Sequence, residues 1–154
     1  MEQVLTGLLL INGTDVYKEY GAFLAEKAKN GHENYDTLFA GAGTKEQVAV
    51  DIREEDGEKL PDELVVRFKP RDLTLYFAIH ATGRAEFLQK RAAFLGFLRT
   101  GDKGWLTLQL TEVDATFKVY LKDVPSAEWE QLSFADGSTA ARFAITFREP
   151  KPSF

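Results

Sequence analysis

The sequence contains no cysteine, only two histidines and no long apolar run. Without cysteine the chain can form neither a disulfide nor a thiolate metal site. Its strongest apolar run, Leu8–Ile11, is four residues long, far short of the roughly 20 residues that a membrane-spanning helix needs. The opening residues lack the basic and apolar segments of a signal peptide. We therefore expect a soluble chain with no membrane partner.

Positive charge is also scarce, and the negative charge is unevenly placed. The chain has 24 acidic and 19 basic residues, which gives a net charge of −5. Residues 31–63 carry ten acids against three bases, a local charge of −7, so the rest of the chain is at +2. A chain with no basic stripe lacks the means to hold a phosphate backbone. We expect no specific binding of nucleic acid.

The two histidines would be the natural centres of a catalytic or metal site, and neither has suitable neighbours. His32 is followed by Glu33 and, further on, Asp36, but adjacent residues of an extended chain point apart, whereas a metal needs converging ligands. His80 lies on the polar face of a predicted strand. None of the four serines occupies a strained strand-to-helix turn of the kind that presents a nucleophile. The sequence predicts no catalytic residue, metal or cofactor, so we expect that the protein is not an enzyme.

Alternation of apolar and polar residues is the main structural signal, and it is typical of strands buried on one face. It predicts strands at 48–53, 64–69, 73–80, 106–110, 117–121 and 143–147. The turn after the first of these is expected at Glu54–Gly57. A further short strand through Leu8–Ile11 ends at Asn12-Gly13, a strong hairpin dipeptide.

One segment has helical character instead. Residues 84–99 contain no proline and many good helix formers, and Thr100-Gly101 follows as a stop. We expect one arc of this helix to be buried against the sheet, formed by Phe87, Leu88, Phe94, Leu95 and Leu98. Arg91 falls inside that arc. We therefore expect either that its aliphatic chain extends along the apolar surface so that the guanidinium reaches solvent, or that the guanidinium pairs with a carboxylate.

The remaining segments complete the expected architecture. Residues 15–20 suit a single helical turn capped by Asp15 or Thr14 and ended by Gly21, and 22–28 is expected to be extended. Weak periodicity predicts a long loop at about 30–45, and prolines predict an extended tail at 149–154. The whole chain, 1–154, is therefore predicted to be one mainly β domain, an antiparallel sandwich or barrel-like fold with one packed helix.

Two tryptophans leave an alternative open. Trp105 and Trp129 could be stacking platforms for a sugar, or they could fill the core or an interface. The first interpretation corresponds to a small β-sandwich module that binds carbohydrate or protein without catalysis.

The order of these features resembles the distal tail proteins of long-tailed bacteriophages, which are related to tail tube proteins. The resemblance rests on the opening Leu10–Gly21, the strand Leu73–Ala81, the helix Arg84–Arg99 and the strands after it. Many members of that family carry a second, C-terminal domain, and this chain would correspond to the ring-forming N-terminal domain. The resemblance implies a structural protein of the virion tail, made in the cytoplasm of a bacterial host.

The same resemblance implies that copies of the chain form a hexameric ring between the tail tube and the tail tip. Its partners would be itself, the tube protein and the baseplate hub. Phe97 faces away from the predicted buried arc, so it contacts either another molecule or a loop of its own chain. Candidates for the contact between subunits are Phe97, Glu86, Lys90, Tyr76 and Phe39. Candidates for an acidic loop facing the channel are Glu54, Glu55 and Asp56.

Overall fold

A curled antiparallel sheet forms the centre of the molecule. The computed structural model describes residues 7–25, 33–51, 53–54, 56–124, 130–133 and 139–154. Its eight-stranded sheet has the order β2-β1-β7-β8-β10-β6-β3, with β9 paired to β10, and a separate ribbon pairs β4 with β5. The strands are β1 Leu9–Ile11, β2 Thr14–Asp15, β3 Ala22–Leu24, β4 Val50–Asp51, β5 Glu58–Lys59, β6 Arg71–Ala81, β7 Leu106–Leu110, β8 Ala115–Asp123, β9 Glu130–Ser133 and β10 Thr139–Glu149.

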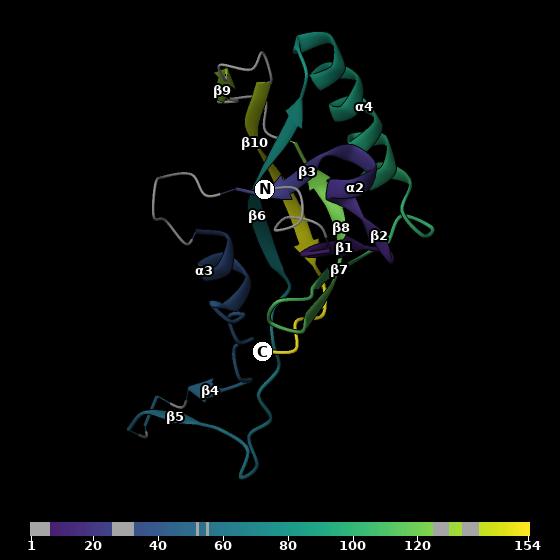
Figure 1. The fold of residues 1–154 in the computed structure, drawn as a ribbon. Coiled ribbons are helices and arrows are strands. Elements are labelled where there is room, and N and C mark those ends of the chain that lie inside the picture. Colours follow the sequence, from purple (N-terminus) through teal and green to yellow (C-terminus); the bar gives the residue numbers. More distant parts are fainter. Residues whose placement is uncertain (1–6, 26–32, 52, 55, 125–129, 134–138) are drawn as a thin grey trace.

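The described residues also form three helices, α2 Val16–Tyr20, α3 Glu33–Phe39 and α4 Arg84–Thr100. Figure 1 shows the sheet as a half-barrel, with α4 and α2 on one side and α3 beside β6. None of the described helices is long and apolar enough to span a membrane. The predicted fold class, a mainly β antiparallel domain with one long packed helix, is confirmed.

The core follows from the alternation in the strands. In β6 the side chains of Leu73, Leu75, Phe77 and Ile79 are all buried, and β10 pairs with β6 along its whole length, from Thr139↔Ala81 to Glu149↔Arg71. The ring of Phe77 lies 5.6 Å from that of Phe94 on α4 and 6.1 Å from that of Phe147 on β10. Helix and sheet are thus joined by an aromatic cluster that removes large apolar areas from water.

Helix α4 lies where it was predicted, but its buried face is narrower than the sequence suggested. Phe87, Phe94, Leu95 and Leu98 are buried, whereas Leu88 is 47% exposed, so the prediction for Leu88 is wrong. Leu88 lies one step of 100° beyond Phe87, past the edge of the contact with the sheet. Arg91 lies within the buried arc, as predicted, and its guanidinium is 5.3 Å from the centre of the Phe143 ring.

The opening hairpin forms as predicted. Asn12 and Gly13 both have positive φ, 52° and 80°, as a two-residue turn between paired strands requires. The side chain of Asp15, rather than Thr14, caps α2 by accepting from the backbone N–H groups of Tyr17 and Lys18. Gly21 ends the helix in the left-handed conformation at φ 67°.

Two predictions for the middle of the chain are wrong. The predicted loop at 30–45 contains α3, whose residue Asn34 is buried and exchanges hydrogen bonds with the backbone of Tyr76 on β6. The predicted strand at 64–69 contributes only an isolated bridge, Thr44↔Phe68. In both cases the structure depends on partners distant in sequence, which alternation cannot reveal. The predicted strand at 48–53 is reduced to β4, and β9 was not predicted.

Residues 43–69 form a long projection that we call the arm. Its two sides run antiparallel: the Lys45 N–H donates to the Arg67 carbonyl at 2.8 Å, and the Lys69 N–H donates to the Gly43 carbonyl at 2.7 Å. Strands β4 and β5 lie near its tip, which extends away from the sheet in Figure 1. The predicted turn at 54–57 lies between these two strands. In the sequence, the arm connects α3 to β6.

Candidate interaction surfaces

The predicted contact residues of α4 are largely engaged within the chain. Lys90 lies 3.0 Å from Glu86 in an ion pair one helical turn apart, and its Nζ donates to the backbone carbonyl of His80 at 3.1 Å. Glu86 also accepts hydrogen bonds from the backbone and hydroxyl of Thr82. These bonds, first from Thr82 and then from Lys90, lower the pKa of Glu86 to about 2. The pair therefore fastens the first turns of α4 to β6.

Phe97 is partly covered by its own chain. Its ring lies 5.3 Å from the ring of Tyr20 at the end of α2, and it packs against the core as a partly buried side chain. The sequence left open whether Phe97 contacts another molecule or a loop of its own chain. In the structure its own chain covers part of the ring, and the covering residue, Tyr20, belongs to helix α2 rather than to a loop.

Phe39 and Tyr76 lie on other elements. Phe39, the last residue of α3, is 43% exposed, and its ring stacks on Phe154 at 6.2 Å and on Tyr35 at 6.1 Å. Tyr76 is half-buried in the middle of β6. The predicted contact residues are thus distributed over α4, α3 and β6.

The predicted acidic residues lie at the end of the arm. Glu54 and Asp56 are exposed in the turn between β4 and β5, and Glu55 lies outside the described residues.

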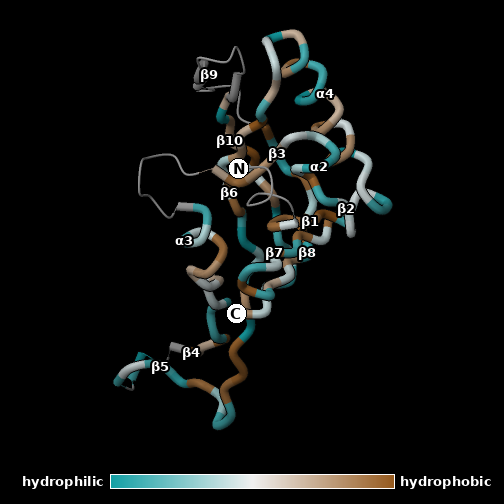
Figure 2. The backbone as a smooth tube through the Cα atoms, viewed as in Figure 1, coloured by the Kyte–Doolittle hydropathy of each residue, from teal (hydrophilic) through white to brown (hydrophobic). Residues whose placement is uncertain are grey.

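The arm also presents an apolar surface that sequence reasoning missed. Seven of its large apolar side chains are exposed, from 39% for Leu60 and Phe68 to 85% for Val48, the others being Val50, Leu64, Val65 and Val66. Figure 2 shows hydrophobic residues along the arm between β5 and β6. Alternation did mark these residues, but it implied a sheet layer that would bury them. That layer is not found among the described residues.

A second surface lies on the side of the sheet that faces away from α4. Side chains point alternately to the two sides of a sheet along each strand. In β6, β7, β8 and β10 every second side chain is buried, and the side chains that alternate with them point to this other side. They include Trp105 (just before β7), Lys118, Tyr120, Lys122, Arg142, Arg148 and Asp72. We call this the outward sheet face. Asp123 of β8 belongs to it too, because it pairs with Thr146, so the face carries four basic side chains and two acids, Asp72 and Asp123.

The aromatic and charged groups of the outward sheet face contact one another. Trp105 is 38% exposed, Tyr120 meets its ring edge-on at 5.9 Å, and the Lys118 ammonium lies 4.8 Å from its centre. Asp72 accepts from Lys122 at 2.5 Å and from Arg148 at 2.9 Å. The hydrogen bond from Lys122 is the main cause that holds the pKa of Asp72 below its ordinary value.

This arrangement bears on the carbohydrate alternative. A sugar stacks on an open indole face, whereas one face of Trp105 is occupied by the Lys118 ammonium. The other candidate platform, Trp129, lies outside the described residues.

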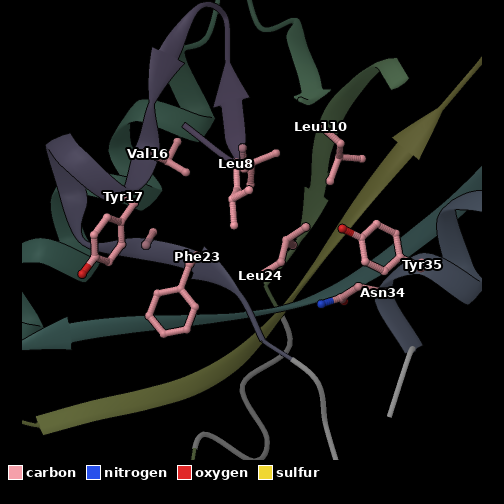
Figure 3. A pocket seen from close by; sticks show the side chains of 10 residues that line it. Leu8, Val16, Tyr17, Phe23, Leu24, Asn34, Tyr35 and Leu110 are labelled. Atoms are coloured by element: carbon pink, nitrogen blue, oxygen red, sulfur yellow. The ribbon is translucent and has the colours of Figure 1, made fainter. Parts of the chain in front are cut away.

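An apolar pocket lies between the two ends of the curled sheet. Figure 3 shows β1 and β3 on opposite sides of it, with α2 and α3 adding further walls. It contains about 530 Å³ of empty space, partly open to solvent, and is lined by Leu8, Leu9, Val16, Tyr17, Ala22, Phe23, Leu24, Asn34, Tyr35 and Leu110. The amide of Asn34 donates to the carbonyls of Ala25 and Tyr76, and the hydroxyl of Tyr35 donates to Glu112. The pocket therefore offers apolar contact rather than acid–base groups.

The two histidines were the residues considered for a metal site in the sequence. His32 lies outside the described residues, and His80 is half-buried on β6. Within the part of the chain that the structure describes, no three His, Asp or Glu side chains gather as metal ligands.

The fold has a counterpart among known structures. The chain is similar to the crystal structure of the SPP1 Dit protein, which is described as a paradigm of the hub adsorption apparatus in Gram-positive infecting phages. The superposition has a TM-score of 0.52 at 14% sequence identity. It covers 92% of this chain and 49% of the Dit chain, so the chain spans about half the length of that protein.

The sequence comparisons gave no further relatives. No protein family model matches the chain, and no curated protein matches it. At 14% identity the structural likeness establishes a shared fold, one that occurs in a phage hub adsorption protein.

Proposed function

We propose that the chain is a structural component of a phage tail. The observation that carries this proposal is the likeness to a phage hub protein over 92% of the chain. It coincides with the resemblance in the opening segment, in β6 and in α4, where the strand, helix and hairpin occur in the predicted order. The proposal assigns the chain no catalytic step.

In finer terms, we propose that it is a ring-forming distal tail protein that links the tail tube to the tail tip. Copies in head-to-tail contact close into a ring when the rotation between neighbours divides a full turn. Such a contact needs two different surfaces on one chain. The arm and the outward sheet face are two exposed surfaces of different chemistry, one acidic and apolar, the other basic and aromatic.

Particles purified from the source that encodes the chain provide the test of its location. Gold-labelled antibodies against the chain should mark one end of the tail in electron micrographs. Antibodies against an unrelated protein of the same preparation serve as the control. Label on the capsid, or a chain missing from washed particles, would contradict the proposed function.

A further inference from the structure

The arm has the surface of a segment that becomes buried in an assembly. Val48 is 85% exposed, Val66 61% and Val50 57%. A lone two-stranded ribbon is marginal in water, and large apolar patches on a chain usually mark a contact with another molecule. Exposed apolar side chains are also not confined to alternate positions of the arm, because Val65 and Val66 are adjacent and both more than half exposed. The arm thus has apolar groups to bury.

The charge of the arm restricts the partner. The whole arm, residues 43–69, has eight acids against five bases, a net charge of −3, and its inner stretch 46–63 has eight acids against two bases, a net charge of −6. Like charges placed together at an interface oppose association, and complementary charges favour one partner over others. The partner surface should therefore combine basic groups with apolar or aromatic ones.

The outward sheet face meets both requirements. Its basic groups are Lys118, Lys122, Arg142 and Arg148, and its acids on the same four strands are Asp72 and Asp123, which leaves a charge of +2. Trp105 and Tyr120 supply exposed aromatic area, at 38% and 37%. Side chains of Trp, Tyr and Arg are enriched among residues that dominate binding energies. The two halves of a complementary contact are thus present on one chain.

We propose that the arm of one copy lies across the outward sheet face of a second copy. The inference rests on the proposed function and names the contact that would build its ring. The exposure of the arm excludes a contact of its valines with their own sheet, and Figure 1 shows the arm directed away from the body. The contact is heterologous, since two different surfaces meet, so each copy can bind one neighbour with its arm and another with its sheet.

Site-specific cross-linking tests this geometry. Because the chain has no cysteine, a Val66→Cys variant and a Tyr120→Cys variant each carry one thiol. A short thiol–thiol cross-linker should join the two chains in a mixture of these variants. Val113→Cys is the matched control, because Val113 is also exposed but lies in the turn between β7 and β8. Equal yields from the control mixture and the test mixture would overturn the proposed contact.

Charge reversal gives an independent measurement. Glu54→Lys with Asp56→Lys reverses the tip of the arm, and Lys118→Glu with Lys122→Glu reverses the sheet face. Each double variant should raise the concentration at half-assembly by about tenfold or more. A chain that carries all four changes should recover much of the loss, because the signs are again opposite. Arg84→Glu, at an exposed position of α4, changes a charge outside the proposed contact, and this variant should assemble as the wild type.

The outcomes separate this inference from the proposed function. A wild-type chain that never self-associates contradicts the proposed ring, and the arm contact with it. A wild-type chain that assembles while every arm and sheet-face variant assembles equally well contradicts only the arm contact. Thermal unfolding verifies that the variants are folded, and all the changed side chains are exposed.

Discussion

At the scale of residues, the least replaceable polar contact lies at one end of the β6–β10 pair, where Arg71 and Glu149 are opposite each other. Arg71 Nε lies 2.6 Å from Glu149 Oε1, and both side chains are at most 10% exposed. The guanidinium also donates to the carbonyl of Leu38 at the end of α3 and lies 5.2 Å from the centre of the Phe154 ring. One ion pair therefore ties together α3, β6, β10 and the tail.

Replacing Glu149 by glutamine should be strongly destabilising. The Arg71 charge would stay buried without a counter-charge, and breaking a buried pair costs ~3–5 kcal/mol. Asp72→Asn is the matched control, because Asp72 pairs with Lys122 and Arg148 at the surface, where an ion pair contributes about 1 kcal/mol or less. Urea unfolding measures both variants. Equal losses would show that the Arg71 pair is not a buried contact.

The Glu86 carboxylate predicts a pH dependence. Its pKa is lowered from 4.5 to about 2 in the folded chain, chiefly by the hydrogen bonds from Thr82. A carboxyl with a depressed pKa stabilises the fold above its unfolded pKa, and this contribution is lost as the pH falls through the folded pKa. The stability difference between wild type and Glu86→Gln should be constant above pH 4.5 and shrink toward pH 2. A difference that grows on acidification would contradict this.

At the scale of elements, alternation and helical periodicity predicted the parts that pack against each other. Strands β6, β7, β8 and β10 and helix α4 were found from sequence because a single buried face determines each of them. Helix α3 was missed because its support comes from far away: Phe154 stacks on Phe39. The strand expected at 64–69 has the right pattern but no sheet beside it. The sequence pattern identifies an apolar face that must be buried, but it does not reveal which element packs against that face.

The surroundings of the predicted sites likewise depend on residues far away in the sequence. Phe97 was marked by its position among charged residues; Tyr20 of another helix covers part of it, and its contact with a second subunit stays a prediction. The two surfaces that matter most here were not assembled from sequence. The outward sheet face needs the order of the strands, which brings Lys122 and Arg148 to the same Asp72.

The junction between α2 and β3 offers a test at this scale. Gly21 has φ 67°, and a Cβ built there would lie 2.9 Å from the His80 carbonyl. Gly21→Ala should therefore lose more than the ~1–2 kcal/mol of a left-handed conformation. Gly96→Ala is the control, because this helical glycine has nothing within 4 Å of its Cβ and alanine should stabilise α4 by about 0.5–1 kcal/mol. Thermal unfolding measures both, and a tolerated Gly21→Ala would contradict the close approach.

At the scale of the whole molecule, a body with a complete core carries an arm that has none. The body buries its apolar strand faces under α4, while the arm leaves seven large apolar side chains exposed. The acids are concentrated in one part of the arm, where residues 46–63 hold −6, while the arm as a whole holds −3 and the body −2. We propose that neighbouring copies of the chain bury these exposed side chains of the arm.

The mass of the purified wild-type chain in solution tests this account most directly. Light scattering over a wide range of concentration, with electron microscopy of the same samples, measures the size and the shape of any assembly. The account predicts that single chains give way to a closed ring as concentration rises, at a threshold that increases with salt because the contact joins opposite charges. A single-chain mass at every concentration and every ionic strength would contradict it.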